Sequence, residues 1–461
     1  MNSHSLPCDI SIDQSASIAE AFRCLNVNKM GIVFITDNAR RVVGCVTDGD
    51  IRRQLLVKDD LTVAVSAFMN TEFQSAGSSA TREHILKLLD HRVHVLPLLD
   101  ENGHLVRVCR RDDILHQEET EIFSRARAPA RISFGGGGSD VTHYFFEQGG
   151  VVLSAAIARY AHATLRKRQN SSIRVYSFDL DQSFEAEDIS ELEFDGTLDL
   201  VKAVLRLINP EFGFDLEVST DFPVGSGLGG SASLAVAIIG TFNEFRLDPW
   251  DRHQVAEMAF QSERLRLNLP GGWQDQYAAA FGGINYMEFS ADENVIIPLR
   301  LEPRVMREIE ASAVLCYTGK AHNSGAIHTD QKKQTTSSVV AQAAIRKQKD
   351  LTHEMKRHLL RGDIYGYGRF LDQAWKAKRE MSALISDPEM DAIYDLAKAN
   401  GAWGGKILGA GGGGYFMFFV PPFARYSLCK ALESQGLKCE RVLLDEDGLV
   451  SWRMRAPDAV Q

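Results

Sequence analysis

Over the first quarter of the chain, the order of apolar and polar positions occurs twice. Residues 35–53, ITDNARRVVGCVTDGDIRR, are matched 63 positions later by residues 98–116, LLDENGHLVRVCRRDDILH. In each copy a helical pattern precedes a short β-rich run, a polar turn, a second strand and a charged helix start. Two copies of a small unit usually bury the apolar faces of their sheets against each other. The pattern predicts a paired β-α module over 1–122, with a charged linker at 116–129.

The rest of the chain alternates between strand and helix patterns. Residues 214–222, FDLEVSTDF, alternate as a strand does, and residues 231–245, SASLAVAIIGTFNEF, form a strongly apolar helix pattern. Further helices are predicted at 251–269, at about 332–361 and at about 363–381. We therefore expect an α+β fold, with one α+β domain at 123–300 and a second at 301–461.

The composition of the chain excludes several classes of function. The chain has 461 residues, a formal net charge of -10 and 24% charged residues, without a basic stripe that could neutralise a nucleic-acid backbone. Its seven cysteines are scattered and form no C-x-x-C, which favours free thiols in a reducing compartment such as the cytoplasm. The first thirty residues lack an apolar signal core, and no apolar run is long enough for a membrane span. We expect a cytoplasmic protein that binds neither nucleic acid nor membrane.

A glycine-rich loop between the strand at 214–222 and the apolar helix matches more than one phosphate-binding pattern. A dinucleotide-binding fold would need a second strand with an acidic end about 20 residues on, but RLDPWDRHQVAEMAF reads as a turn and a helix. A P-loop would need a lysine, which Gly230-Ser231-Ala232 lacks. What remains is a helix N-terminus that holds a phosphate, with the Ser231 hydroxyl placed for a nucleotide-bound Mg²⁺. The structural alternative is a plain turn with Ser231 as an N-cap.

Other glycine clusters flank this loop in sequence. Residues 128–140, APARISFGGGGSD, run from a short strand into four glycines, and residues 406–419, KILGAGGGGYFMFF, run from glycines into an apolar strand. Residues 271–289, GGWQDQYAAAFGGINYMEF, lie between them. Four successive glycines indicate a close backbone approach or positive φ angles, and a ligand is the economical explanation.

Two carboxylates are candidates for phosphoryl-transfer chemistry, which needs a metal-side and an acceptor-side acid. Glu263 shares the apolar stripe of Ala256 and Phe260 on its helix, so its carboxylate faces the core and needs a cation or strong donors. An internal ion pair to an arginine is the alternative. Asp275 follows the Gly271-Gly272 turn, where a plain N-cap is the alternative.

Together these segments resemble the GHMP small-molecule kinases over nearly all of 128–461. That resemblance implies an ATP-dependent, Mg²⁺-using kinase with a ribosomal S5-like α/β domain, a ferredoxin-like C-terminal domain and an active site between them. It places Asp275, within Gly272-Trp-Gln-Asp275-Gln276, beside the acceptor hydroxyl, and makes Glu263 a metal ligand with Ser231. Arg131 stands where the family has a lysine close to the transferred phosphate, which implies a catalytic role, and Gly230 stands where many members have serine. The ATP-binding residues implied are Pro223, Gly225, Ser226, Gly227, Leu228, Gly229, Gly230, Ser231 and Ala232.

The run Gly136-Gly137-Gly138-Ser139-Asp140 resembles the branch that phosphorylates sugars at the anomeric hydroxyl, notably the D-glycero-D-manno-heptose 7-phosphate kinases. Fucokinases are more distant relatives of that branch. The resemblance implies substrate contacts from Gly136, Gly137, Ser139, Asp140, Lys320, Gly411 and Gly412. For a phosphate on the acceptor, the candidate cations are Arg159, Lys320, His322 and Lys406, each of which could equally be a solvated surface charge.

The first repeat copy contains Gly44-Cys-Val-Thr47-Asp-Gly-Asp50, and the paired arrangement resembles a tandem CBS module. In that family, Thr47 and Asp50 would hold the ribose of an adenine nucleotide effector, and the module would join two chains into a dimer. The alternative is that both residues only cap a helix. The second copy has arginines in place of the glycine and threonine, which could hold a phosphate instead.

An ATP-dependent sugar kinase is the preferred hypothesis. A catalytically silent nucleotide-sensing protein would keep the glycine loops but lose the carboxylates, and Ser231, Glu263 and Asp275 are all present. An NAD enzyme would need the missing strand and ribose-binding acid.

Overall fold

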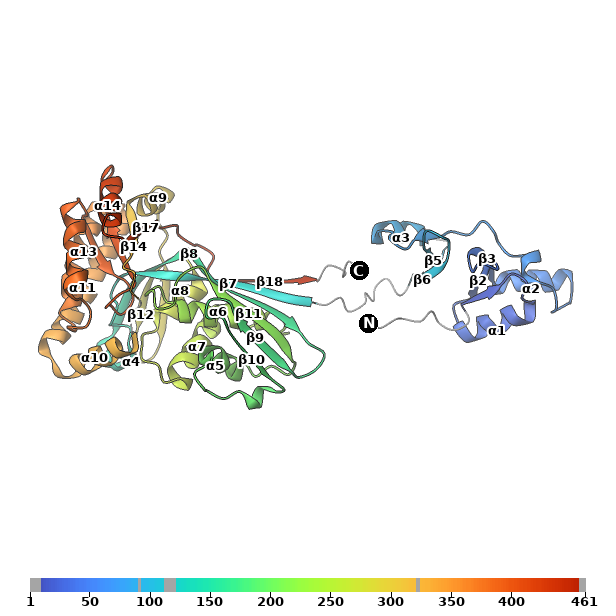
Figure 1. Ribbon diagram of the computed structural model, residues 1–461, viewed down its shortest axis with the longest axis horizontal. Helices are drawn as coiled ribbons and strands as arrows, with labels where there is room; N and C mark the ends of the chain where they lie inside the picture. The colour runs from blue at the N-terminus through green and yellow to red at the C-terminus, as the bar shows by residue number, and fades with distance from the viewer. Residues whose placement is uncertain (1–9, 90–92, 112–121, 321–323, 456–461) are drawn as a thin grey trace. The chain divides into compact units, whose positions relative to one another are not determined.

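The structure is a computed structural model that describes residues 10–89, 93–111, 122–320 and 324–455. The chain forms two compact units, Met1–Thr120 and Glu121–Gln461 (Figure 1).

The N-terminal unit contains the predicted repeat. Its first copy comprises β1 (Ser11–Asp13), α1 (Ile18–Asn28), β2 (Ile32–Thr36), β3 (Val42–Thr47) and α2 (Asp48–Val57), and its second comprises β4 (Ala76–Gly77), α3 (Arg82–Leu88), β5 (Val95–Leu99) and β6 (Leu105–Arg110). The sheets have the orders β1-β2-β3 and β4-β5-β6, each with a parallel first pair and an antiparallel second pair. The helix start predicted after β6 lies outside the described residues.

The two copies bury apolar sheet residues against each other, as the repeat predicts. Phe34 and Cys45 of the first sheet are buried in one cluster with the partly buried Val95 and Leu105 of the second. The backbone N–H of Val42 also donates to the carbonyl of Gly103, at 2.9 Å. The repeat therefore folds as one unit with a shared apolar contact.

The larger unit is built on a sheet whose longest strand is β8. The elements of its first half are β7 (Ile122–Gly135), α4 (Thr142–Gln148), β8 (Gly150–Lys167), β9 (Ile173–Ser177), β10 (Gln182–Ala186), α5 (Asp199–Ile208), β11 (Phe214–Thr220), α6 (Gly230–Asn243), α7 (Arg252–Phe260), the π-helical turn η4 (Gln261–Arg266), α8 (Gln274–Phe281), β12 (Ile284–Phe289) and β13 (Asn294–Pro298). Within the described residues the sheet order is β10-β9-β11-β8-β12-β13, and β7 pairs with both β8 and β18 (Val450–Arg455).

The linker predicted at 116–129 is wrong in its second half, because residues 122–129 belong to β7. Ser124, Ala126 and Ala128 are buried on one face of the strand, and Arg125 is exposed on the other. The alternation of buried and exposed positions typical of a strand is present in the sequence, but the buried positions hold small residues and not large apolar ones. Arg125 and Arg127 made the segment look like a charged connector.

The apolar helix α6 packs with α5, α7 and α8 on one side of this sheet (Figure 1). Its residues from Ala235 to Ile239 are fully buried, which explains why the sequence there is apolar all round. The Ser233 hydroxyl donates to the carbonyl of Pro129 at 2.8 Å, which ties the first turn of α6 to β7.

The second half of the unit forms an antiparallel sheet flanked by helices. Its elements are α9 (Pro303–Ser312), β14 (Ala313–Tyr317), α10 (Ser324–Ser337), α11 (Val339–Arg361), α12 (Ile364–Arg379), α13 (Pro388–Ala399), β15 (Gly404–Ile407), β16 (Tyr415–Phe419), α14 (Ala424–Glu433) and β17 (Lys438–Arg441), with sheet order β15-β16-β14-β17. The helix predicted at 332–361 is two helices, because Ser338 is the N-cap of α11 and accepts from the Ala341 N–H. Helices α11 and α12 share one core with β7 and β8.

The turn after β7 generates a stability prediction. A Cβ on Gly136 would lie 1.9 Å from the carbonyl oxygen of Val151, and its φ of +79° disfavours any side chain. We expect Gly136→Ala to destabilise the larger unit by more than about 2 kcal/mol, since the backbone conformation alone costs about 1–2 kcal/mol. Tryptophan fluorescence during urea unfolding measures this unit selectively, because all 5 tryptophans lie within 121–461.

Gly137→Ala in the same turn is the control, because the nearest atom to its Cβ would be the Ser133 hydroxyl at 3.5 Å. Equal unfolding midpoints for the two variants would contradict the packing described for this turn.

Candidate active site

The glycine-rich loop leads from β11 into α6 with three glycines in the left-handed region. Gly225, Gly227 and Gly229 have φ angles of 71°, 81° and 79°. Gly229 is the N-cap of α6 and no side chain caps the helix, so the structural alternative of Ser231 as N-cap does not hold. Ser231 is exposed in the first turn, where the uncapped N–H groups and the helix dipole favour an anion.

Arg131 of β7 is bound to this loop through both its backbone and its side chain. Its backbone N–H donates to the carbonyl of Leu228 at 2.9 Å, and one guanidinium N–H donates to the carbonyl of Gly227. The other side of the guanidinium makes two bonds to Asp275, Nε to Oδ1 at 2.8 Å and Nη2 to Oδ2 at 2.9 Å. This fork geometry is one that arginine provides and lysine does not.

Asp275 lies in the first turn of α8, whose N-cap is Trp273, so Asp275 is not the cap residue. A Cβ on Gly229 would lie 3.4 Å from both the Arg131 Cζ and the Asp275 Cγ. The loop backbone therefore approaches the ion pair closely, and glycine leaves the space for it. The structure brings together the three segments that hold Arg131, Asp275 and Gly229.

Asp140 is buried beside this pair. Its carboxylate accepts hydrogen bonds from the backbone N–H of Gly138 at 3.0 Å and from the side-chain amide of Gln274 at 3.1 Å. Burial, followed by the charge of Asp275, raises the pKa of Asp140. Gly272 has no room for a side chain, because a Cβ there would lie 1.9 Å from Asp140 Oδ2.

The other residues of the Gly136–Asp140 turn either stabilise the turn or line a cavity. The Ser139 hydroxyl is fully buried, donating toward the carbonyls of Gly136 and Val151 at 2.8 Å and accepting from the Val151 N–H. It therefore fixes the turn. Gly137 and Gly138 line a small cavity of about 50 Å³ together with Arg131, Asp140 and Asp275.

Two buried lysines border the same cavity. Lys406 of β15 donates to the carbonyl of Ser133 at 2.9 Å, and burial, followed by the charge of Arg131, lowers its pKa to about 7. Lys378 of α12 donates to the carbonyls of Ile407 and Gly409, and burial, followed by the charge of Lys406, lowers its pKa well below 10.5. Sequence reasoning missed Lys378. The sequence indicates the burial of Lys378 through its spacing from Leu371 and Ala374, which places it on the buried face of its helix.

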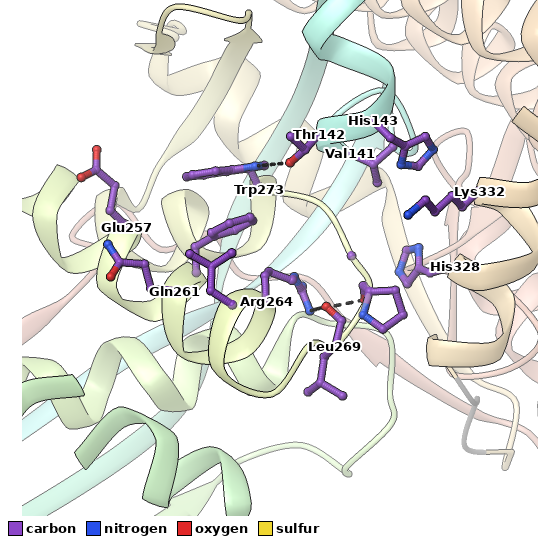
Figure 2. Close-up of a pocket in the computed structure, with 14 residues that line it drawn as sticks. Val141, Thr142, His143, Glu257, Gln261, Arg264, Leu269, Trp273, His328 and Lys332 are labelled. Carbon is purple, nitrogen blue, oxygen red and sulfur yellow. Dashed lines mark hydrogen bonds between the residues drawn. The ribbon is translucent and has the colours of Figure 1, made fainter. Parts of the chain in front are cut away.

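A larger cavity of about 680 Å³ adjoins the small one (Figure 2). Arg264 and His328 line both cavities. The 271–275 segment also lines both, because Gly271 and Trp273 face the larger cavity and Asp275 the smaller. A ligand can therefore extend from the ion pair into the larger space.

Glu263 is buried, with 1% of its surface exposed, as the helical stripe predicts. It lies in the π-helical turn η4, accepts a hydrogen bond from the Gln276 amide and is 3.9 Å from Arg264. Among the residues that the structure describes, no group of three His, Cys, Asp or Glu side chains could hold a metal ion. The metal role of Ser231 and Glu263 stays a prediction.

The C-terminal glycine loop is close to the central one. Tyr415 donates its backbone N–H to the carbonyl of Ser226 at 3.1 Å, and a Cβ on Gly414 would lie 2.4 Å from that oxygen. Gly411 and Gly412 instead pack near Ile385.

The predicted phosphate-binding cations lie in different places. Lys320 forms ion pairs with Glu389 and Asp387, and Arg159 pairs with Glu440 at 2.8 Å. Neither lines the two cavities described above. Lys406 lines the small cavity, and His322 lies outside the described residues.

In the N-terminal unit, Thr47 and Asp50 form the capping box of α2. The Thr47 backbone N–H and hydroxyl donate to Asp50 at 2.8 and 2.7 Å. Burial would raise the pKa of Asp50, but the bonds from Thr47 and Arg53 outweigh it and lower the pKa. A cavity of about 750 Å³ in this unit is lined by residues of 12–27, and these two residues are not among them.

Comparison with known proteins decides the family. Residues 199–283 match the GHMP kinases N terminal domain, residues 355–437 match the GHMP kinases C terminal domain, and residues 7–57 and 65–119 match CBS domains. D-glycero-alpha-D-manno-heptose 7-phosphate kinase of Campylobacter jejuni is 37% identical over 344 residues, covering 72% of this chain and 99% of that protein. The chain belongs to the GHMP kinase family. The predicted fold class and the predicted enzyme class, an ATP-dependent sugar kinase, are confirmed.

Solved structures agree with this family. A D-glycero-D-manno-heptose 1-phosphate kinase from Bacteroides thetaiotaomicron has 31% identity and a TM-score of 0.61, covering 72% of this chain and 100% of its own. A Campylobacter jejuni sugar kinase has 34% identity and a TM-score of 0.61, with 73% and 100% covered. L-fucokinase/L-fucose-1-P guanylyltransferase of Bacteroides fragilis is 27% identical over 66% of this chain but only 35% of that protein. No helix in the described part of the chain is long and apolar enough to cross a bilayer.

The buried Lys406 of this kinase generates a pH prediction. Between about pH 7 and 10 the unfolded chain holds a proton on this lysine that the folded chain releases, because burial lowers the folded pKa from 10.5 to about 7. The free energy of unfolding therefore rises with pH in this window, by at most about 1.4 kcal/mol per pH unit from this group. Lys406→Met is expected to flatten that rise, measured by urea unfolding from about pH 7 to about 8.5 with tryptophan fluorescence.

Lys376→Met is the matched control, because Lys376 is a largely exposed lysine on α12. The same slope in Lys406→Met and the native chain would show that Lys406 stays charged in the folded state.

Proposed function

We propose that this kinase transfers the γ-phosphoryl group of ATP to the anomeric hydroxyl of D-glycero-D-manno-heptose 7-phosphate. The observation that carries the proposal is the Arg131–Asp275 ion pair, which lies against the glycine loop and borders a cavity rich in basic groups. The similarity to heptose kinases at 31–37% identity supports the sugar class.

Different groups of the chain have different roles in the proposed reaction. The uncapped N–H groups that open α6 bind the ATP phosphates, and the Arg131 guanidinium neutralises charge that develops on the transferred phosphoryl group. Asp275 orients the acceptor hydroxyl and takes its proton. Magnesium, when bound, would neutralise phosphate charge and would be held by Ser231 and Glu263.

Asp140 is the group proposed to bind sugar hydroxyls. A carboxylate accepts two hydroxyls at once. Two further polar atoms at the small cavity, the Ser133 hydroxyl and the Gln274 Oε1, are buried without a hydrogen-bond partner. Buried polar atoms of this kind are costly unless a ligand satisfies them, and a polyhydroxylated sugar supplies both donors and acceptors. Contacts from Gly136, Gly411, Gly412 and Lys320 stay predictions.

A fucokinase-like sugar 1-kinase is the second candidate. The relation to the Bacteroides fragilis fucokinase over 66% of this chain favours it, and it would need no cations for an acceptor phosphate. A nucleotide-sensing protein without catalytic activity is disfavoured by the intact ion pair at Asp275.

The N-terminal unit is proposed to bind an adenine nucleotide at Thr47 and Asp50 and to join two chains into a dimer. The CBS match over 7–57 and 65–119 supports both parts of this proposal. The ribose would have to bind Asp50 beside its capping contacts, because the cap occupies Oδ2 and Arg53 occupies Oδ1.

The catalytic proposal is tested with a panel of hexoses, heptoses and heptose 7-phosphates. Consumption of ATP is measured for the native chain, Asp275→Asn and the exposed control Asp292→Asn. We expect heptose 7-phosphate to be the best acceptor and Asp275→Asn to lower its turnover by at least about a hundredfold, because the variant cannot take the proton. Phosphorus NMR of the product should show an added anomeric phosphate.

Unchanged turnover in Asp275→Asn would remove this residue from the mechanism. A preference for fucose over every heptose would favour the second candidate.

The effector proposal is tested by calorimetric titration of the full chain with AMP. We expect Asp50→Asn to weaken binding by at least about tenfold, because a charged acceptor for the ribose hydroxyls is lost while a capping oxygen remains. Asp48→Asn is the control on the same helix turn. Equal affinities in the native chain and Asp50→Asn would leave only the capping role, and light scattering of the same samples measures whether the chain is a dimer.

A further inference from the structure

The larger cavity has two chemically different ends. His143, His328 and Lys332 converge at one end, and Arg264 lies between them and the middle of the cavity (Figure 2). Glu257 lies at the opposite end (Figure 2). The charge is therefore separated across the cavity, with its basic groups gathered on one side.

Three separate elements deliver these basic groups. His328 and Lys332 are one helical turn apart on α10, which puts them on the same face. His143 comes from α4 and Arg264 from the π-helical turn. Arg264 and Lys332 supply positive charge and the two imidazoles supply hydrogen-bonding groups, a combination that suits a phosphate.

The surroundings lower the pKa of both imidazoles at this end of the cavity. Burial, followed by the charge of Lys332, lowers the pKa of His143. Burial, followed by the charge of Arg264, lowers the pKa of His328 to about 4. Both imidazoles are therefore mostly uncharged near neutral pH, and each keeps one ring N–H that can donate a hydrogen bond.

Two polar atoms at this end are buried without a hydrogen-bond partner, His328 Nδ1 and Arg264 Nε. Both belong to residues that line the two cavities at their junction. A buried guanidinium N–H without an acceptor is costly, and an oxyanion is the acceptor that suits it best.

We propose that the basic end of this cavity, formed by His143, Arg264, His328 and Lys332, binds the phosphate ester at the far end of the acceptor sugar. The inference rests on the proposed function, because it places the reacting hydroxyl at Asp275. The volume of about 680 Å³ is within the usual range for small-molecule sites, about 300–1,000 Å³. A sugar phosphate that begins at Asp275 passes Arg264 and His328 and ends at Lys332.

The apolar side of the cavity suits the carbon backbone of such a sugar. The rings of Phe260 and Trp273 are stacked with centroids 3.5 Å apart, and the indole N–H donates to the Thr142 hydroxyl at 3.1 Å. These contacts make a rigid apolar wall, and Trp273 lies on the side of the cavity toward Glu257, away from Lys332 (Figure 2). The sites predicted from sequence for this phosphate, Lys320 and Arg159, are instead paired with carboxylates outside the cavity.

The test compares an acceptor with its unphosphorylated counterpart. The kcat/KM values for heptose 7-phosphate and for heptose are measured in the native chain, Lys332→Ala, His143→Ala and the control Lys333→Ala. We expect the ratio of the two values to fall about tenfold in Lys332→Ala and in His143→Ala, through KM more than kcat, because each variant loses a hydrogen bond to the phosphate. Lys333 adjoins Lys332 on α10 but is not part of the cavity lining, so its removal should leave the ratio unchanged.

A binding measurement separates this inference from the proposed function. Mannose 6-phosphate and inorganic phosphate are titrated calorimetrically into the same four proteins. Weaker binding of mannose 6-phosphate in Lys332→Ala, but not in Lys333→Ala, supports the site even if heptose 7-phosphate is not the preferred acceptor. Binding of inorganic phosphate with equal affinity would mean that the sugar adds nothing, which contradicts a joint sugar-phosphate site.

A native chain that prefers heptose 7-phosphate, with the same preference in Lys332→Ala and His143→Ala, would overturn the inference and leave the proposed function intact. A native chain that neither prefers the phosphorylated acceptor nor binds mannose 6-phosphate would overturn both.

Discussion

The candidate active site depends on the ion pair between the buried Arg131 and the partly exposed Asp275, which are 144 positions apart in sequence. Arg131 also holds the glycine loop through its backbone and its guanidinium, so three elements, β7, α8 and the start of α6, meet at one side chain. Removing Asp275 would leave the Arg131 guanidinium buried without its carboxylate partner, which costs several kcal/mol. The contact that aligns the two groups proposed for catalysis is therefore also one that holds these elements together.

Around this pair basic side chains outnumber carboxylates. Arg131, Arg264, Lys378 and Lys406 line the small cavity, which has only Asp140 and Asp275 as carboxylates. Burying such a set costs free energy that anionic ligands restore when they bind. Ligand affinity and folding stability are therefore linked at this site, because an anionic ligand such as ATP stabilises the folded chain when it binds.

The sequence predicted what depends on local chemistry. The repeat in the N-terminal unit, the strand–glycine–helix unit around α6 and the burial of Glu263 follow from periodicity and from glycine conformations. Long-range contacts could not be predicted in this way. The grouping of His143 with α10 and the burial of Lys378 depend on how distant elements pack, and β7 was obscured because small residues carry its buried face.

The π-helical turn at 261–266 limits which deletions and substitutions this segment tolerates. Its wide turn lets the adjacent Glu263 and Arg264 serve different neighbours, Gln276 on one side and the ligand cavity on the other. Deleting one residue from 261–266 would restore a regular α-helix and rotate the following positions by about 100° per residue lost. A deletion before Glu263 would therefore displace both its carboxylate and the Arg264 guanidinium, whereas Arg266 is exposed, does not line the cavity and is free to vary in type.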